Sequence, residues 1–202
     1  MADENWETAL SRMPLDTNPA PLNRDNCMPL MLGAFQSNAV IKALIFLPAV
    51  ADDFYLLNRD QPKLNIRAAN LREAVVALTN ATAVRASFRF PFLLLHLQRD
   101  NLEPIFVIRH AATAIRLKEK CHLPQVLFND RHWERVQPLL EQGMGVKVLP
   151  AAISEDAWHF NRHNLAGSNL TDWEVLSALS LAGKTSFTVG RDRIVFQVPQ
   201  GR

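Results

Sequence analysis

The sequence predicts an α+β protein in which helices flank a small mixed β-sheet. Two observations support this class. Short runs of branched and aromatic residues, suited to strands, alternate with segments whose apolar residues recur every three or four positions, as in amphipathic helices. The chain also has 202 residues, of which 48% are hydrophobic and 21% charged, which suffices for one domain with a buried core. This composition argues against a disordered tail, a fibre or a membrane protein.

The pattern divides the chain into an N-terminal arm (residues 1–35), an α/β core (36–150) and a C-terminal helix and hairpin packed on the core (151–202). The arm is expected to be irregular and to lie along the surface, although Trp6 and Leu10 have the spacing of a short amphipathic helix. Four prolines interrupt its periodicity: Pro14, Pro19, Pro21 and Pro29.

The first half of the core is predicted to begin with a strand over 39–47, which is rich in branched and aromatic residues. An irregular connection follows over 51–63. Asn65 is a candidate cap for a helix over 67–79, whose apolar residues are spaced four and three apart. Residues 84–97 alternate and then become continuously apolar, which predicts one strand with a buried second half.

The second half of the core alternates strands with helices, an order typical of an α/β arrangement. Asn129 or Asp130 is the expected cap of its second helix, and Gly143 or Gly145 the expected end. The predicted elements are a short buried strand over 104–108, a helix over 109–120, a strand over 123–128, a helix after 130 and a strand over 146–149.

The tail carries its own local signals. Thr171 is placed to cap a helix that ends at Gly183. Residues 185–198 alternate around Gly190 and Asp192, which predicts a β-hairpin.

The formal net charge of +2 conceals an uneven distribution of charge. Residues 59–135 hold 13 basic and 7 acidic side chains, whereas residues 1–58 hold 3 and 7. Arginine outnumbers lysine 16 to 6, and a guanidinium can hold a phosphate or a carboxylate through two donors. The middle of the chain is therefore the expected region of contact with an anionic partner, unless the arginine content reflects only the bias of the source genome.

Cys27 and Cys121 do not form a C-x-x-C pair, which predicts reduced thiols in a cytoplasmic protein without a disulfide framework or a zinc knuckle. Residues 1–7 are acidic and polar, unlike a signal peptide, and no apolar run reaches the length of a membrane span. His159 and His163 have a spacing that suits zinc, but no third ligand is nearby, so we expect surface or packing roles for them.

The first candidate site is the start of the helix over 109–120. A helix N-terminus offers free backbone N–H groups that attract phosphate, and Arg109 and His110 would add side-chain donors there. Arg116 follows about two turns later on nearly the same face. This pattern predicts a phosphate-binding site formed by these three residues, with ordinary solvated side chains as the alternative interpretation.

The second candidate site follows the strand over 123–128. Asp130, His132 and Glu134 could supply a metal-binding carboxylate and a general base for phosphodiester hydrolysis. Asp52 and Asp53 could add oxygen ligands for Mg²⁺. The alternatives are helix capping by Asp130 and an exposed turn at the aspartate pair.

Residues 106–128, FVIRHAATAIRLKEKCHLPQVLF, resemble the signature region of the ParB/sulfiredoxin superfamily, and in particular its plasmid fertility inhibition branch. In that branch a G-R-H-R turn joins a strand to a helix and holds nucleotide phosphates, and a Leu-Pro pair precedes the next strand.

Arg109 and His110 match the first Arg and the His of the turn, and Arg116 matches a later basic residue. Ile108 stands where the family has glycine, and Ala111 where it has the second Arg. Residues 51–57, ADDFYLL, also resemble the segment that follows the first strand of the branch.

The resemblance implies a ParB/sulfiredoxin-like core, ATP and Mg²⁺ as cofactors, and ATP hydrolysis with DNA binding or cleavage. It implies a fertility inhibition factor that blocks the transfer of competing DNA by conjugation. The implied partners are DNA and a type IV secretion coupling protein or a relaxase–DNA complex, which could bring the protein to the periphery of the inner membrane.

Two alternatives remain open. Ile108 and Ala111 could mark a lost nucleotide site in a non-enzymatic adaptor, whose basic central face binds a coupling protein or DNA. A homodimer could instead form through the hairpin, with residues 194–198 pairing with a second copy.

Overall fold

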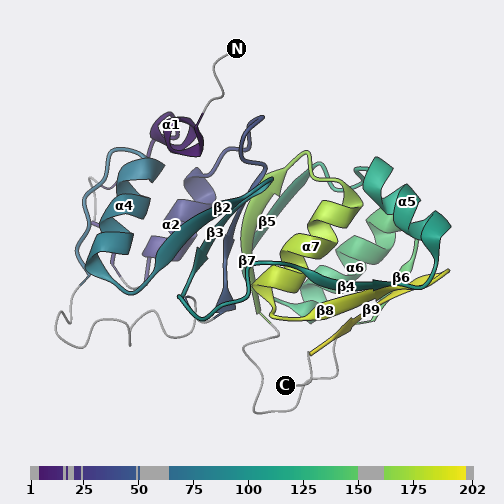
Figure 1. The fold of residues 1–202 in the computed structure, drawn as a ribbon. Coiled ribbons are helices and arrows are strands. Elements are labelled where there is room, and N and C mark those ends of the chain that lie inside the picture. The colour runs from purple at the N-terminus through teal and green to yellow at the C-terminus, as the bar shows by residue number, and fades with distance from the viewer. Residues whose placement is uncertain are drawn as a thin grey trace.

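The computed structural model describes residues 5–15, 17, 21–23, 25–48, 50, 64–149 and 162–198, apart from the side chain of Asp130. Asp52, Asp53 and His159 lie outside these residues. The described chain forms four layers, with helices, a five-stranded sheet, more helices and a four-stranded sheet in succession (Figure 1). The predicted α+β class is confirmed at this level.

The five-stranded sheet has the order β2-β3-β1-β7-β5. Strand β1 runs parallel to β3, and the other pairs are antiparallel. The central strands β3, β1 and β7 are buried along nearly their whole length. The strand bounds are β1 Ala43–Phe46, β2 Arg85–Arg89, β3 Phe92–His96, β5 Gln125–His132 and β7 Arg162–Ser168.

Three helices from the N-terminal part of the chain cover one face of this sheet: α1 (Trp6–Ser11), α2 (Cys27–Ala34) and α4 (Leu71–Ala81). The prediction of an irregular surface arm is therefore wrong in part. The short helix suggested by the spacing of Trp6 and Leu10 is present, but a second helix follows, and both bury apolar side chains under the sheet. The fully buried residues from the arm include Leu10, Leu22, Cys27 and Met31.

The other face of the five-stranded sheet is covered by α5 (Ala111–Glu119), α6 (Trp133–Met144) and α7 (Asp172–Ala182). The predicted N-cap of α7 and the predicted end of α6 are confirmed. Thr171 and Glu174 form a capping box at the start of α7, and Gly145 ends α6 in the left-handed region at φ 64°. In the described part of the chain, none of the helices has the length and apolar character needed to span a bilayer.

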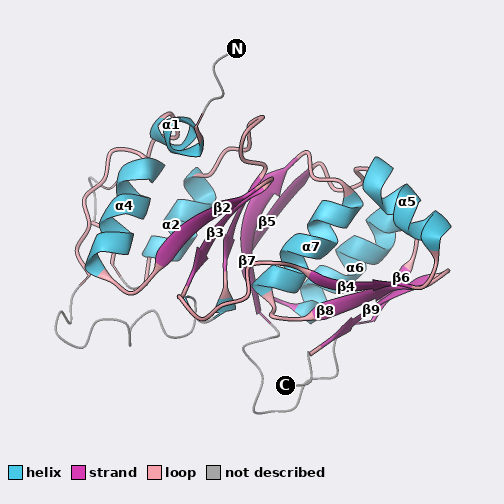
Figure 2. Cartoon of the chain, in the orientation of Figure 1, coloured by secondary structure: helices cyan, strands magenta, loops and turns pink. Residues whose placement is uncertain are grey.

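The same helices lie between the two groups of strands in Figure 2. The second sheet has the order β4-β8-β9-β6, with bounds β4 Ile105–Ile108, β6 Lys147–Leu149, β8 Ser186–Val189 and β9 Arg193–Gln197. Alternate side chains of its strands point into the core against the helices: Val148, Phe187, Val189, Ile194 and Phe196. The helices cover this inner face only.

The hairpin predicted over 185–198 is confirmed as β8–β9, but it forms the centre of the second sheet and not an outer layer. Strand β9 pairs with β8 on one side and, along residues 193–195, with β6 on the other. It is therefore not the outer strand that the sequence suggested, and Ile194 and Val195 are already paired on both sides. Strand β4 is also not buried as predicted, since it is an edge strand and all four of its residues are exposed.

Three boundaries differ from prediction for local reasons. Residues 84–97 form the hairpin β2–β3 around Phe90 and Pro91, in place of one strand. Asn70, not Asn65, caps α4 by accepting from the N–H of Glu73. Strand β5 continues past its predicted end to His132, with a register shift between Phe128 and Arg131, so neither Asn129 nor Asp130 caps α6.

Candidate functional site

A row of basic side chains crosses one end of the second sheet. Lys147 on β6 pairs with Arg193 on β9, and the N–H of Gly190 donates to the carbonyl of Arg193 at 2.9 Å. Arg109 continues β4 and donates its N–H to the carbonyl of Val189 at 2.9 Å. The sheet register therefore places Arg109, Gly190, Arg193 and Lys147 side by side, and we call these residues the basic row.

The three cations of the basic row are on the outer face of the sheet, which the helices leave uncovered. Their neighbours along the strands, Val148 and Ile194, point into the core, and side chains alternate along a strand. Arg109, Arg193 and Lys147 are all exposed, and none forms an ion pair with a described residue. Adjacent strands are about 5 Å apart, so the row extends for about 14 Å.

The hairpin turn completes this end of the sheet. A Cβ on Gly190 would lie 3.1 Å from the carbonyl oxygen of Arg193, so the close backbone approach in the turn favours glycine. Arg191 and Asp192 follow it and are both exposed. Asp192 is thus the acidic residue nearest to the row along the hairpin, and the cluster keeps an excess of positive charge.

Glu141 of α6 lies near Lys147 but is held by other groups. Its carboxylate accepts the N–H of Val148 at 2.9 Å and a bond from Gln137 at 3.2 Å. These two hydrogen bonds, and more weakly the charge of Lys147, lower the pKa of Glu141 below its ordinary value. The carboxylate is therefore ionised near neutral pH and partly balances the charge of Lys147.

His110 has a structural task at the start of α5. Its Nδ1 accepts the N–H of Thr113 as the helix cap, at 3.3 Å, and lies 2.8 Å from Thr113 Oγ1. That hydroxyl donates to the carbonyl of Arg191 at 3.0 Å. His110 and Thr113 therefore attach α5 to the hairpin turn, beside the basic row.

Arg116 is not part of the basic row. It lies in the last turn of α5, where its carbonyl accepts the N–H of Lys120, and its side chain is exposed. Six residues separate it from Arg109, and five of them are in the helix, which places it in the helical layer. Of the three predicted phosphate ligands, the structure brings Arg109 and His110 to one end of the sheet and leaves Arg116 further along the helix.

The predicted hydrolytic residues lie at a different junction. Asp130 is in β5, His132 ends that strand and precedes α6 without a capping hydrogen bond, and Glu134 is exposed in the first turn of α6. The described residues contain no group of three His, Cys, Asp or Glu side chains that could hold a metal ion. Asp130 and His132 belong to the five-stranded sheet and Glu134 to α6, whereas the basic row lies on the four-stranded sheet.

His163 of β7 is buried in the core next to Trp133, with ring centroids 4.6 Å apart. Its Nδ1 donates to the carbonyl of Arg131 at 3.2 Å, and its Nε2 has no hydrogen-bond partner among the described residues. Burial lowers the pKa of His163 to about 4. His163 is thus a neutral packing residue at pH 7, in agreement with the role expected from the sequence.

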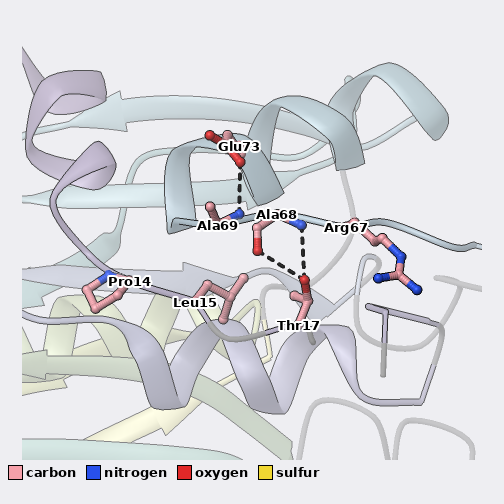
Figure 3. Close-up of a pocket in the computed structure, with 7 residues that line it drawn as sticks. All are labelled: Pro14, Leu15, Thr17, Arg67, Ala68, Ala69 and Glu73. Atoms are coloured by element: carbon pink, nitrogen blue, oxygen red, sulfur yellow. Dashed lines mark hydrogen bonds between the residues drawn. The ribbon is translucent and has the colours of Figure 1, made fainter. Parts of the chain in front are cut away.

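The hollow in Figure 3 has a volume of about 520 Å³ and lies where the N-terminal segment contacts the start of α4. Its polar groups bond to one another. The hydroxyl of Thr17 donates to the carbonyl of Ala68 at 3.0 Å, and the N–H of Ala69 donates to Glu73 at 2.8 Å. Arg67 points away from the other labelled residues. This hollow is a seam between two chain segments, in which Thr17 bonds to Ala68 and Ala69 bonds to Glu73.

The sequence did not predict Arg193 and Lys147 as members of the site. The segment F-T-V-G-R-D-R predicts a hairpin turn, because too few residues follow it for a helix and a further strand. The alternation of Arg193 with the buried Ile194 is the signal that could have placed Arg193 on an outer sheet face.

Comparisons of the chain with protein-family models, curated proteins and solved structures found no match.

Proposed function

We propose that this protein binds the phosphate backbone of a nucleic acid through the basic row. The observation that carries the proposal is the sheet register, which aligns Arg109, Arg193 and Lys147 from three separate segments on one uncovered face. Contacts of Lys and Arg with phosphate supply the sequence-independent part of nucleic-acid affinity. None of these side chains forms an ion pair with a described residue, and only the charge of Lys147 is partly balanced, by Glu141, so the row keeps positive charge for a partner.

The shape of the site favours an extended polyanion over a single nucleotide. The three cations are exposed on the outer face of the sheet, and they are spread over about 14 Å, whereas a nucleotide site normally encloses its ligand. Successive phosphates of a nucleic-acid strand can contact such a row together. The proposal therefore concerns binding, and it assigns no hydrolytic step to Asp130, His132 or Glu134.

The resemblance to fertility inhibition factors suggests one biological setting for this binding, which is interference with the transfer of conjugative DNA. What supports this setting is the match of Arg109 and His110 at a strand-to-helix turn, together with the position of Arg109 in the basic row. In this setting the protein would act as a DNA-binding adaptor at a type IV secretion coupling protein.

The test is a salt titration of binding to a fluorescent DNA duplex, followed by anisotropy. The variants are Arg193→Ala, Lys147→Ala and the double variant, with Arg116→Ala as an exposed control outside the row. Each lost phosphate contact should weaken binding and reduce the slope of log K against log salt by about 1. The control should keep both the affinity and the slope of the unmodified protein.

The proposal fails if the double variant binds DNA with an unchanged affinity and salt slope. It also fails if Arg116→Ala weakens binding as much as the double variant, because the contact would then lie on the helical layer.

A further inference from the structure

Strand β4 is an open sheet edge without a charged residue. Among the described strands its only neighbour is β8, and its four residues, Ile-Phe-Val-Ile, are between 42% and 50% exposed. Most proteins protect such an edge with charges, a bulge or a covering segment, because the unpaired backbone groups can join another strand. In the described part of the chain, β4 has none of these within its length.

The backbone groups that face this open edge follow from the parallel pairing of β4 with β8. Arg109 donates its N–H to Val189, and in a parallel pair alternate residues bond to the same neighbour. Ile105 and Val107 therefore bond toward β8. Phe106 and Ile108 direct their N–H and carbonyl groups outward, and so does the carbonyl of Pro104, which has no N–H to donate.

We infer that the β4 edge pairs with β4 of a second copy, antiparallel and centred on Phe106, to give a two-fold symmetric dimer with one continuous sheet. In this register the two Phe106 residues exchange a pair of backbone hydrogen bonds. Each Ile108 N–H donates to the carbonyl of Pro104 in the other copy. Because Pro104 has no N–H, the carbonyl of Ile108 that faces it receives no hydrogen bond from the other copy. This carbonyl lies at each end of the contact, where water can donate to it.

Charge complementarity selects this register from its neighbours. Centring on Phe106 places Glu103 of each copy directly opposite Arg109 of the other, at both ends of the contact. Positions 103 and 109 are bends that flank the strand, and both lie an even number of residues from Val107, so the inferred register places these opposite charges on one face. Centring on Val107 would place Arg109 opposite Ile105 and would leave Glu103 unpaired.

Both charged residues are available for this contact. Glu103 is 75% exposed on its side chain and makes only a long ion contact, 3.9 Å from Arg89. Arg109 is exposed and makes no ion pair with a described residue. In the register centred on Phe106, the helices of both copies lie on the same side of the joined sheet. Phe106 therefore remains packed on Trp173 in each copy, with ring centroids 4.9 Å apart.

The contact is short, so we expect a reversible dimer whose population depends on protein concentration. Its outer face would present two basic rows, one at each end of the joined edge. The inference does not depend on nucleic-acid binding, because it rests on the edge of β4 and the charges at its ends.

The experiment is sedimentation equilibrium over a range of concentrations, applied to a charge-reversal cycle. Glu103→Arg and Arg109→Glu should each weaken the dimer at least roughly tenfold, because like charges then oppose each other at both ends. The double variant should restore the dimer, since the charges are exchanged and still complementary. Lys147→Glu, the same charge change on the opposite edge strand, should leave the dimer unchanged.

A monomer at all concentrations would overturn the inference, and so would a dimer that is insensitive to both single reversals. A double variant that stays dissociated would overturn the proposed register.

The double variant also separates this inference from the proposed function. Because it lacks the cation at position 109, it should regain the dimer while its affinity for DNA stays reduced. A failure of DNA binding in every variant, with the cycle intact, would count against the proposed function alone.

Discussion

Strands β1 and β4 are each four residues long and wholly apolar, yet every residue of β1 is buried and every residue of β4 is exposed. Strand β1, Ala-Leu-Ile-Phe, has a strand on each side and helices over both faces. Strand β4, Ile-Phe-Val-Ile, has one neighbouring strand and helices over one face. The difference shows that position in the sheet, and not composition, decides whether such a strand stabilises the core or presents a surface.

The largest expected effect comes from the same substitution in the two strands. Ile45→Ala in β1 removes a fully buried side chain, and it should lower the free energy of unfolding by about 2–5 kcal/mol. Ile105→Ala in β4 removes a side chain that is 46% exposed, and the loss should be about 1 kcal/mol or less. Urea unfolding at low protein concentration measures both. Equal losses would contradict the difference drawn between the strands.

The burial of the central strands can be tested through His163, which lies on β7 next to β1. Its pKa of about 4 in the folded protein is below its ordinary value of 6.5, so between these pH values the unfolded chain binds a proton that the folded chain does not. The contribution of neutral His163 to the free energy of unfolding should therefore be fully present above pH 6.5, and it should be lost as the pH falls toward 4. The loss at the lower limit is up to about 3 kcal/mol.

The control for this prediction is His163→Gln, which lacks the titrating group. Unfolding free energies of both proteins are measured between pH 7 and pH 4, and the difference removes the contribution of the other groups. The variant should be less stable at pH 7 and should lose less stability on acidification. Parallel pH profiles would show that His163 is not the group responsible.

A smaller effect is expected at the helix that the two strands share. Helix α7 covers β1 and also places Trp173 against Phe106 of β4. Thr171→Ala removes the side-chain oxygen that accepts the N–H of Glu174, and it should cost about 1 kcal/mol of unfolding free energy. Thr171→Ser keeps the oxygen and should restore most of the loss. Thermal unfolding of the three proteins tests this, and a Ser variant as unstable as the Ala variant would contradict the cap.

Several local signals predicted local structure in this chain, although the caps predicted at Asn65 and at Asn129 or Asp130 are wrong. The N-cap at Thr171, the left-handed Gly145 and the alternation on both sides of Gly190 each depend on a few neighbouring residues, and each is confirmed. Arg109 and His110 were also correctly placed where a strand leads into a helix.

Features that depend on distant neighbours were not predicted. A continuous apolar run cannot show which strand will pair beside it, so β4 was expected to be buried and β9 to be an edge. The same limit explains the candidate site. Arg193 and Lys147 lie 46 positions apart in the sequence, and only the pairing of β6 with β9 makes them neighbours of one another.

The order of the strands also bears on how the protein is made. A ribosome releases the chain from its N-terminus, but β7 is the strand that joins β1 to β5, and β8 and β9 are the strands that join β4 to β6. Until residues 162–198 have emerged, neither sheet can close, and the apolar strands β1 and β4 lack their later partners. Both sheets therefore stay incomplete until residues 162–198 have been synthesised, because this one segment supplies strands to both of them.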